Sequence, residues 1–374
     1  MQTKLLDKHK SQFLFRHRHP IEGRDDAMLF MHGKSVVNFT SNDYLNLANH
    51  PDVKKAFIEG VQTYGLGSGS ANFVSGYFKS HKLLEDAFCE FLNRDRAILF
   101  NSGYHANLGV ISSLANKNSV IIADKLCHAS IIDGIQLSRA KYYRYRHNDM
   151  SHAEYLTHQH DNPLLITESV FSMQGNLTDI KKLAGLKARL IVDDAHGIGV
   201  VGKTGKSICE TQHNIACLVT PLGKALGSFG AIVSGSEDIV EHILQFARTY
   251  YFTTSLPPSV SHATLTSLKV MREESWRRET LHHLINFFIK GSSERGFSLV
   301  SSDQTPIKSI LVASNMKAIE IQQKLLEKNI LVSCIRPPTV PNNASRIRIS
   351  LNCLHTEAQI TQLLDELSYE IKSC

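Results

Sequence analysis

Six short apolar runs constrain the fold of this 374-residue chain more than any other feature of its sequence. They occupy residues 97–100, 120–123, 164–167, 190–192, 217–219 and 231–233. Runs of this length are typical of strands buried on both faces, and most of the stretches between them are long enough for a crossover helix. We therefore expect an α/β fold in which a large, mostly parallel sheet is wrapped by helices.

The pattern changes after residue 265, where the sequence predicts a smaller α+β lobe. Strands are expected at 309–313, 330–335 and 346–351, and helices at 318–327 and 357–369. Helices are also expected at 236–249 and 259–274, before this lobe. The chain is thus divided into an N-terminal segment (1–40), a large domain (41–265) and a C-terminal domain (266–374).

Polar and glycine residues follow four of the apolar runs. They are Ser102-Gly103-Tyr104, the stretch 168–175, the stretch 193–197, and Lys224. Ligands of open parallel sheets gather at the carboxyl ends of the strands, so we expect a binding site where these residues meet.

Lys224 and Asp193 have the chemistry that pyridoxal 5'-phosphate (PLP) requires. A lysine in a tight, partly desolvated turn can lose its proton near neutral pH and form an imine with an aldehyde. An acid at a strand end can hold a protonated pyridine nitrogen, which makes the ring an electron sink. The prediction is that Lys224 carries PLP and Asp193 faces the ring nitrogen.

Each of these features also has a simpler interpretation. A lysine between small residues is often merely solvated, His128 could be a packed histidine, and Ser172 could be a turn residue. Asp193 and His196 could bind a metal, but no third or fourth ligand is evident, so no metal is expected. The glycine-rich stretch 65–72 does not match a P-loop or a dinucleotide-binding fingerprint.

Composition and charge exclude several classes of protein. No stretch approaches the roughly 18 apolar residues of a membrane span, and the basic start lacks the apolar core of a secretory signal. The seven cysteines are scattered, which favours a reducing cytoplasm. No dense basic run predicts nucleic-acid binding. The net charge of +6 indicates either simple solubility or a basic entrance for an anionic substrate such as a CoA thioester or an acidic carrier protein.

Taken in order, the motifs of this chain resemble those of the α-oxoamine synthase family of fold-type-I PLP enzymes. The resemblance covers nearly the whole chain. It rests on residues 41–45 (SNDYL), 74–77 (VSGY), 101–107 (NSGYHAN), 128–130 (HAS), 147–149 (HND), 168–173 (ESVFSM), 193–197 (DDAHG) and 223–224 (GK). The run 336–341 (RPPTVP) resembles the branch of the family that acts in biotin biosynthesis.

The resemblance implies roles for four residues around the cofactor ring. Lys224 would hold PLP covalently and later move protons at the substrate α-carbon. Asp193 would keep the ring nitrogen protonated, because a nearby anion favours the charged form. His196 would hydrogen-bond the phenolic oxygen of the ring, and His128 would stack on the ring face.

It also implies how the phosphate is held. Backbone N–H groups of Gly103 and Tyr104 would bind it at a helix start, where unpaired donors favour an anion. Ser172 would add a polar contact to the cofactor. Thr253 or Thr254 would reach the phosphate of the neighbouring subunit, which implies a homodimer with shared active sites.

The implied reaction joins L-alanine to a pimeloyl thioester of CoA or acyl carrier protein, with loss of carbon dioxide and the thiol. Arg16, Asn42, Arg336 and Thr339 would bind the substrate carboxylate and acyl groups, since a guanidinium suits a carboxylate. The alternative is another family member that joins glycine or a different amino acid to a different acyl-CoA.

One position departs from the family pattern. A phosphate-binding threonine usually stands three residues before the lysine, where this chain has Pro221. Proline has neither a hydroxyl nor an N–H. The neighbouring Thr220 is the candidate to replace that contact.

Overall fold

The computed structural model describes residues 2–212 and 214–372, which divide into two compact units. One unit contains the chain up to Asn46, the short segment Ser172–Asn176 and the chain from Trp276 on. The other contains Leu47–Phe171 and Leu177–Ser275. The sequence-based division at residues 41 and 266 stays a prediction.

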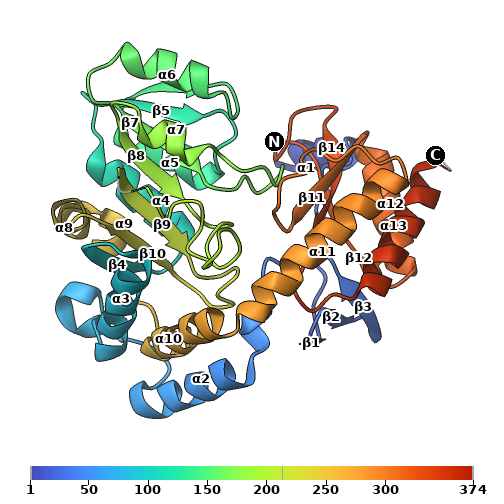
Figure 1. Ribbon diagram of the computed structural model, residues 1–374, viewed down its shortest axis with the longest axis horizontal. Helices are drawn as coiled ribbons and strands as arrows, with labels where there is room; N and C mark the ends of the chain where they lie inside the picture. Colours follow the sequence, from blue (N-terminus) through green and yellow to red (C-terminus); the bar gives the residue numbers. More distant parts are fainter. Residues whose placement is uncertain (1, 213, 373–374) are drawn as a thin grey trace. The chain divides into compact units, whose positions relative to one another are not determined.

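The second unit is built on a seven-stranded sheet with the order β4-β10-β9-β8-β7-β5-β6 (Figure 1). Strands β9, β8, β7, β5 and β6 run parallel, whereas β10 is antiparallel to both of its neighbours. The mostly parallel sheet is as expected. The strands are β4 (Arg96–Phe100), β5 (Val120–Asp124), β6 (Lys141–Tyr145), β7 (Leu164–Glu168), β8 (Arg189–Asp193), β9 (Ile215–Pro221) and β10 (Ala231–Gly235).

Helices cover this sheet because its strands, apart from the edge strand β6, are largely apolar and buried. The core on one face joins β4, β5 and β7–β10 to α4 (Gly103–Leu114), α5 (Ala129–Ser138) and α8 (Glu237–Phe246). The other helical segments are η1 (Leu47–Asn49), α2 (Pro51–Tyr64), η2 (Asn72–Gly76), α3 (Lys79–Leu92), α6 (Met150–His158), α7 (Ile180–Ala184), α9 (Arg248–Tyr251) and α10 (Pro258–Glu273).

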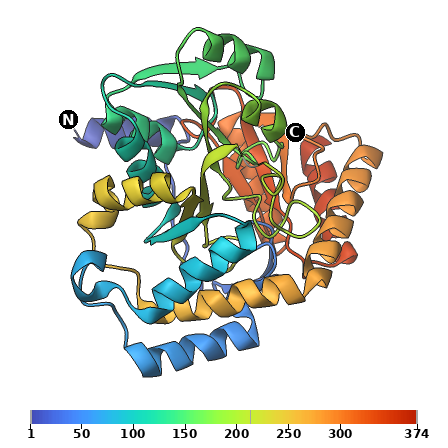
Figure 2. The same ribbon diagram turned by 60° about the vertical axis from the view of Figure 1, so that its left-hand side comes forward.

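Helices α2 and α10 lie side by side (Figure 2). Gly60 makes this close packing possible, since a Cβ there would lie 2.9 Å from the Cα of Ser259. The apolar face of α2 therefore packs on α10 at van der Waals distance, and a larger side chain at position 60 would push the two helices apart.

The first unit contains two small sheets. One has the order β1-β2-β3-β12 and the other β11-β14-β13. Its elements are α1 (Gln2–Ser11), β1 (Gly23–Asp25), β2 (Met28–Met31), β3 (Lys34–Asn38), α11 (Ser275–Glu294), β11 (Ile307–Ala313), α12 (Asn315–Glu327), β12 (Ile330–Leu331), β13 (Ser333–Ile335), β14 (Ser345–Ser350) and α13 (Glu357–Lys372).

Several elements differ from those expected from the sequence. The run 330–335 is not one strand, because β12 pairs with β3 in one sheet while β13 pairs with β14 in the other. The helix expected over 236–249 is interrupted at Ala247, which is extended (φ −73°, ψ 104°) between α8 and α9. Strand β6, the hairpin β1–β2 and helix α11 were not predicted.

Candidate active site

The adjacent parallel strands β8 and β9 position Asp193 and Lys224 in the second unit. Strand β8 ends at Asp193, which is paired in register with Val219 of β9. After β9 the chain turns through Lys224, and the N–H of Gly227 donates to the Lys224 carbonyl at 2.7 Å. Gly227 has φ +58° and a Cβ there would lie 2.1 Å from the Ala48 nitrogen, so only glycine closes this turn.

The Lys224 ammonium lies beside His196. Its Nζ is 2.8 Å from His196 Nε2, and His196 is buried in the turns that follow β8. The two residues are 28 positions apart and meet because the carboxyl ends of parallel strands share one edge of the sheet. The structure thus places Lys224 against His196, three residues after Asp193 at the end of β8, and the roles expected for these residues stay predictions.

The carboxylate of Asp193 is buried and fixed by two donors. Oδ1 accepts the N–H of Ala195 at 3.0 Å, and Oδ2 accepts Nδ2 of Asn107 at 2.6 Å. Asn107 lies on α4 and is only 2% exposed. Sequence reasoning gave Asn107 no role, although the residue stands in the motif 101–107.

Asn107 also begins a chain of hydrogen bonds that ends at His128. Its Nδ2 donates to Ser130 Oγ at 2.9 Å, and that hydroxyl lies 2.8 Å from His128 Nδ1. The backbone N–H of Ser130 also donates to Nδ1, at 3.3 Å. Nδ1 therefore accepts, and the proton of the neutral imidazole sits on Nε2.

The pKa of His128 is lowered from its usual value. Burial is the largest cause, and the positive charge of Lys224 adds to it, while Asp193 opposes the shift. The hydrogen bonds agree with this direction, because a proton on Nδ1 would face the N–H of Ser130. His128 is thus held as a neutral ring with a defined tautomer.

Replacing Asn107 with Ala should lower kcat by about 10- to 100-fold, because a hydrogen bond to a charged group is worth roughly 1.5–3 kcal/mol. Asp193 would lose one of its two donors, and Ser130 would lose the donor that orients its hydroxyl. The checks are steady-state kinetics and imidazole ¹⁵N shifts of His128 in the same variant.

Ser130→Ala is the matched control, because it cuts the link to His128 but leaves Asn107 on Asp193. It should shift the His128 resonances and reduce kcat less than Asn107→Ala does. Unchanged kinetics and unchanged His128 shifts in Asn107→Ala would show that the hydrogen-bond chain has no functional role.

Two more buried carboxyl groups surround this cluster. Burial raises the pKa of Glu168 to about 8, and Asp193 adds to the rise, while Lys224 and the His128 N–H, which donates to Glu168 at 2.6 Å, oppose it. Burial also raises the pKa of Asp194 to about 7, although Ser169 and Ser207 donate to its Oδ1 at 2.5 and 2.6 Å. Both acids are protonated over part of the neutral range.

The raised pKa of Glu168 predicts a stability that falls as pH rises. Between its usual pKa of 4.5 and about 8 the folded protein binds more protons than the unfolded chain, so stability present below pH 4.5 is lost on passing pH 8. The glutamine of Glu168→Gln cannot ionise. The free energy of unfolding of this variant should therefore rise by about 2–4 kcal/mol relative to that of the natural protein between pH 5 and pH 9. Urea unfolding at several pH values measures this.

The exposed Glu154 on α6 supplies the control for that experiment. Glu154→Gln should track the natural protein at every pH. Stability curves for Glu168→Gln that run parallel to the natural protein's would mean that Glu168 is ionised throughout.

The start of α4 carries the residues expected to hold a phosphate. Ser102 caps this helix by accepting the N–H of His105 at 3.2 Å, so the N–H groups of Gly103 and Tyr104 precede the first helical hydrogen bonds. Tyr104 is exposed, and its hydroxyl donates to Asp133. A Cβ at Gly103 would lie 2.6 Å from Cγ of Pro221, so the helix start packs on that proline.

This packing concerns Pro221 and not its neighbour Thr220, the candidate to replace the missing threonine contact. Adjacent residues of a strand point to opposite faces, so Thr220 points away from the side on which Pro221 meets Gly103. Within residues 2–212 and 214–372, the buried Oγ1 of Thr220 has no hydrogen-bond partner. This orientation does not favour the role expected for Thr220, which stays a prediction.

Thr253 and Thr254 lie close to the end of β4. Nδ2 of Asn101 donates to the Thr254 carbonyl at 2.7 Å and to Thr253 Oγ1 at 3.3 Å. Thr254 is exposed and forms an isolated bridge with Ala71. The structure contains one chain, so the expected contact with a neighbouring subunit stays a prediction.

The remaining predicted residues belong to the first unit. Arg16 donates to Thr339 Oγ1 at 3.0 Å, and Arg336 donates to the carbonyls of Phe13 and Phe15. The Arg336 guanidinium thus holds the N-terminal chain, a contact that sequence reasoning did not foresee.

Asn42 and Ser172 share a partner that was missed. Arg348 on β14 donates to the Ser172 carbonyl at 2.7 Å and to Asn42 Oδ1 at 3.1 Å, and it is 5% exposed. The alternation of arginine and isoleucine in β14, whose sequence is SRIRIS, is the sequence signal that could have found it.

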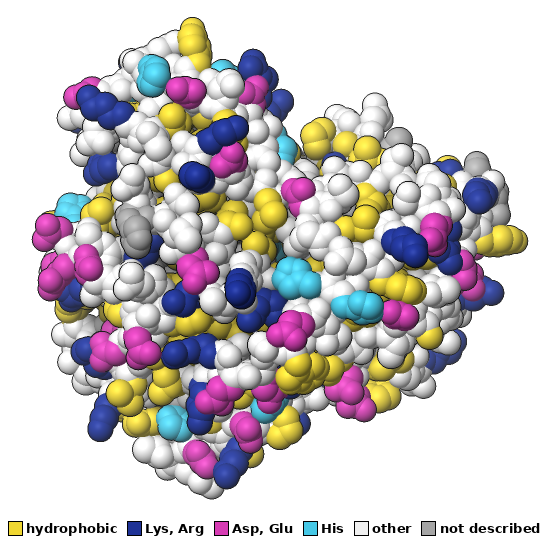
Figure 3. All heavy atoms as spheres, viewed as in Figure 1, with side chains coloured by type: hydrophobic (Ala, Val, Ile, Leu, Met, Phe, Trp, Pro, Cys, Tyr) yellow, Lys and Arg dark blue, Asp and Glu magenta, His cyan; other side chains and the backbone are white. Residues whose placement is uncertain are grey.

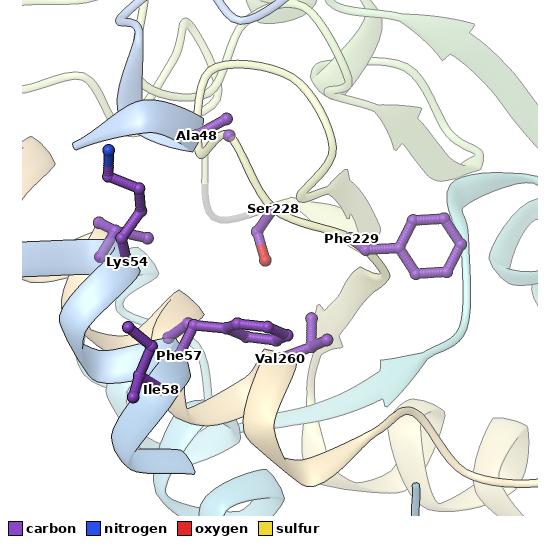
Figure 4. A pocket seen from close by; sticks show the side chains of 10 residues that line it. Ala48, Lys54, Phe57, Ile58, Ser228, Phe229 and Val260 are labelled. Carbon is purple, nitrogen blue, oxygen red and sulfur yellow. The ribbon is translucent and has the colours of Figure 1, made fainter. Parts of the chain in front are cut away.

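An apolar pocket of about 380 Å³ lies next to the Lys224 turn, with residues 227–229 forming one wall. Figure 4 shows the Ser228 hydroxyl in the middle, Lys54 at one end, Phe229 at the other, and Phe57 and Val260 below. Neither Lys224 nor Asp193 is among the residues that line it, so this pocket is separate from the lysine site.

The second unit fits PLP by the chemistry of its groups. An amine, a buried carboxylate with two fixed donors and a helix start with two N–H groups ahead of its first helical hydrogen bonds are what the aldehyde, the ring nitrogen and the phosphate require. Among the described residues, no cluster of His, Cys, Asp or Glu suits a metal ion. In the same part of the chain, no helix is long and apolar enough to span a bilayer.

The fold and the site define a PLP-dependent transferase of fold type I. The profile of the aminotransferase class I and II family matches residues 34–367, and the chain belongs to this family. A lysine-to-alanine variant of a serine palmitoyltransferase from S. paucimobilis, solved with a bound PLP–myriocin aldimine, has a TM-score of 0.91 at 28% identity, and the match covers 99% of this chain and 96% of that one.

The 8-amino-7-oxononanoate synthases are more similar in sequence. That of Nitrosococcus oceani is 44% identical over 97% of this chain and 98% of its own, and that of Cellvibrio japonicus is 41% identical over 98% and 95%. The crystal structure of the enzyme from Francisella tularensis is 40% identical, covers 90% of this chain and 98% of its own, and has a TM-score of 0.81.

Proposed function

We propose that the chain catalyses the decarboxylative condensation of L-alanine with a pimeloyl thioester to form 8-amino-7-oxononanoate, a step of biotin biosynthesis. The observation that carries this is the Lys224 ammonium 2.8 Å from His196, beside the fixed carboxylate of Asp193. Relatives that are 40–44% identical bear the name of this synthase, whereas the serine palmitoyltransferases are 27–29% identical, so the rival with another amino acid is not favoured.

Four residues of the second unit act around the cofactor in this proposal. Lys224 binds its aldehyde and afterwards takes and returns the proton at the substrate α-carbon. Asp193 keeps the ring nitrogen protonated, His196 donates to the phenolic oxygen, and neutral His128 stacks on the ring. When bound, PLP supplies an electron-accepting ring that stabilises negative charge at the α-carbon.

The N–H groups of Gly103 and Tyr104 hold the phosphate, as the geometry at the start of α4 supports. Ser172 adds a polar contact, and Thr253 or Thr254 reaches the phosphate in a second copy, so the proposal includes a homodimer. Pro221 gives no donor, and its packing on Gly103 fixes the helix start instead.

The substrates are bound through residues of the first unit. Arg16, Asn42, Arg336 and Thr339 address carboxylate and acyl groups; Arg348 positions Asn42. The new carbon–carbon bond joins the alanine α-carbon to the thioester carbonyl, the thiol leaves, and the former alanine carboxylate departs as carbon dioxide. Holding both partners in one site supplies the proximity that the condensation requires.

We place the enzyme in the cytoplasm.

One assay tests the proposal. The purified protein with PLP is given alanine, glycine or serine together with pimeloyl-CoA or a longer acyl-CoA, and the products are identified by mass. Alanine with pimeloyl-CoA should be the preferred pair. A clear preference for glycine or serine, or for another acyl group, would replace this function with that of another family member.

A further inference from the structure

The N-terminal chain carries most of the net charge of this protein. Residues 4–19, here called the basic segment, contain the cations Lys4, Lys8, Lys10, Arg16 and Arg18 and a single acid, Asp7. Five positive charges less one negative charge leave +4, out of +6 for the whole chain. The other 358 residues therefore contribute only +2, although they form nearly all of the surface.

These cations are exposed and carry no counter-charge. All five are exposed, and within residues 2–212 and 214–372 none of them takes part in an ion pair. Elsewhere cations meet acids, as Arg96 meets Glu241 and Arg295 meets Asp365. On the face seen in Figure 3, Lys and Arg side chains are interspersed with Asp and Glu.

The basic segment is held in place on its own unit. Nδ2 of Asn315 donates to the Gln12 carbonyl at 3.1 Å, Arg336 donates to the Phe13 and Phe15 carbonyls, and Arg16 reaches Thr339. Helix α1 ends at Ser11, after which Phe13 takes a left-handed conformation (φ +56°) and the chain reverses. A positively charged surface fixed at several points can recognise a partner at low entropic cost.

The basic segment also exposes apolar side chains. Leu6 on α1 is 52% exposed and Phe13 is 46% exposed. A protein partner can bury such apolar side chains together with the charges, whereas a small anionic ligand needs only the charges.

We propose that the basic segment is the docking surface for an acidic acyl carrier protein that delivers the pimeloyl group; this rests on the proposed function. Helix α1 has ten residues and rises about 15 Å, and the cations continue beyond it to Arg18. A row of positive charges of this length complements the acidic side of a partner's helix better than it complements one nucleotide. Arg16, proposed to bind substrate, lies within the segment, so a carrier docked there is held next to a residue that takes its acyl group.

The test compares two donors on one set of variants. The triple variant Lys4→Glu, Lys8→Glu, Arg18→Glu keeps Arg16 and every residue placed in the active site. With pimeloyl-loaded acyl carrier protein its kcat/KM should fall at least about tenfold, mainly through KM, while with pimeloyl-CoA it should stay within about twofold. With the carrier as donor, the kcat/KM of the natural protein should also approach that of the triple variant as NaCl rises from about 50 mM to about 300 mM.

A matched control reverses three exposed cations elsewhere. Lys182→Glu, Lys187→Glu, Lys290→Glu changes the net charge equally and breaks only surface ion pairs, worth about 0–1 kcal/mol each. It should use both donors as the natural protein does. An equal loss in this control, an equal loss with both donors, or no loss with the carrier would overturn the proposal.

Two further results are separated by the same design. If the natural protein turns over neither donor, the proposed function itself has failed. If duplex DNA of matched charge displaces the carrier at lower concentration than unloaded carrier does, the segment is a general polyanion site and the docking proposal is wrong.

Discussion

Lys224→Ala is expected to abolish turnover, with a loss of about 10⁴-fold or more, because the amine that binds the cofactor aldehyde and moves the α-proton is removed. The variant should also lose the absorbance of covalently bound PLP near the edge of the visible range. Product formation by mass and the absorbance of the dialysed protein measure the two effects. Borohydride reduction of the natural protein should leave the cofactor on the peptide that contains Lys224.

Lys203→Ala is the control for this variant, since Lys203 is an exposed lysine in the loop after His196. It should keep full activity and the absorbance band. Melting curves should show both variants folded. Substantial turnover in Lys224→Ala, or cofactor retained on another lysine, would contradict the assignment of the whole site.

The main sheet could be predicted because its physical signal is local. Each of the six apolar runs lies within a strand, and a buried parallel strand is visible as an unbroken apolar stretch. Strand β6 lacks that signal: its sequence KYYRY is charged and aromatic, as suits the edge of a sheet. Helix α11 was missed because it buries Arg277 and Arg278 among its apolar residues, which breaks the usual periodicity.

The C-terminal strands show a limit of a different kind. The run 330–335 is apolar except for Ser333, and one serine does not mark the change of partner from β3 to β14. Strand pairing depends on segments hundreds of residues apart, so a single apolar run can serve two sheets without a local signal.

The same limit explains which parts of the site could be predicted. Apolar runs precede Lys224, Asp193 and His196, and the carboxyl ends of parallel strands share one edge of a sheet, so the sequence predicted that these residues lie close together. Asn107 is 86 residues from Asp193, and only the packing of α4 against the sheet brings its amide to the carboxylate. The orientation of Thr220 also depends on the strand, since adjacent residues of β9 point to opposite faces and its side chain therefore points away from that of Pro221.

Asp193→Asn is expected to lower kcat by about 10³-fold, which corresponds to about 4 kcal/mol of transition-state stabilisation. An amide carries no charge to keep the ring nitrogen protonated. It also has only one oxygen, whereas the two carboxylate oxygens accept from Ala195 N–H and from Asn107. The NH₂ of the new side chain would therefore face another donor, which adds a penalty of about 1–3 kcal/mol to stability.

Asp194→Asn is the informative comparison, because it makes the same chemical change one residue away. Asp194 has a pKa raised to about 7 by burial, and the hydroxyls of Ser169 and Ser207 both donate to one oxygen, Oδ1. A neutral amide can accept both through its own oxygen, so kcat should change only a few-fold. Kinetics, melting curves and the absorbance of bound PLP should be measured on both variants. If the two lost activity equally, the charge of Asp193 would not be what the reaction uses.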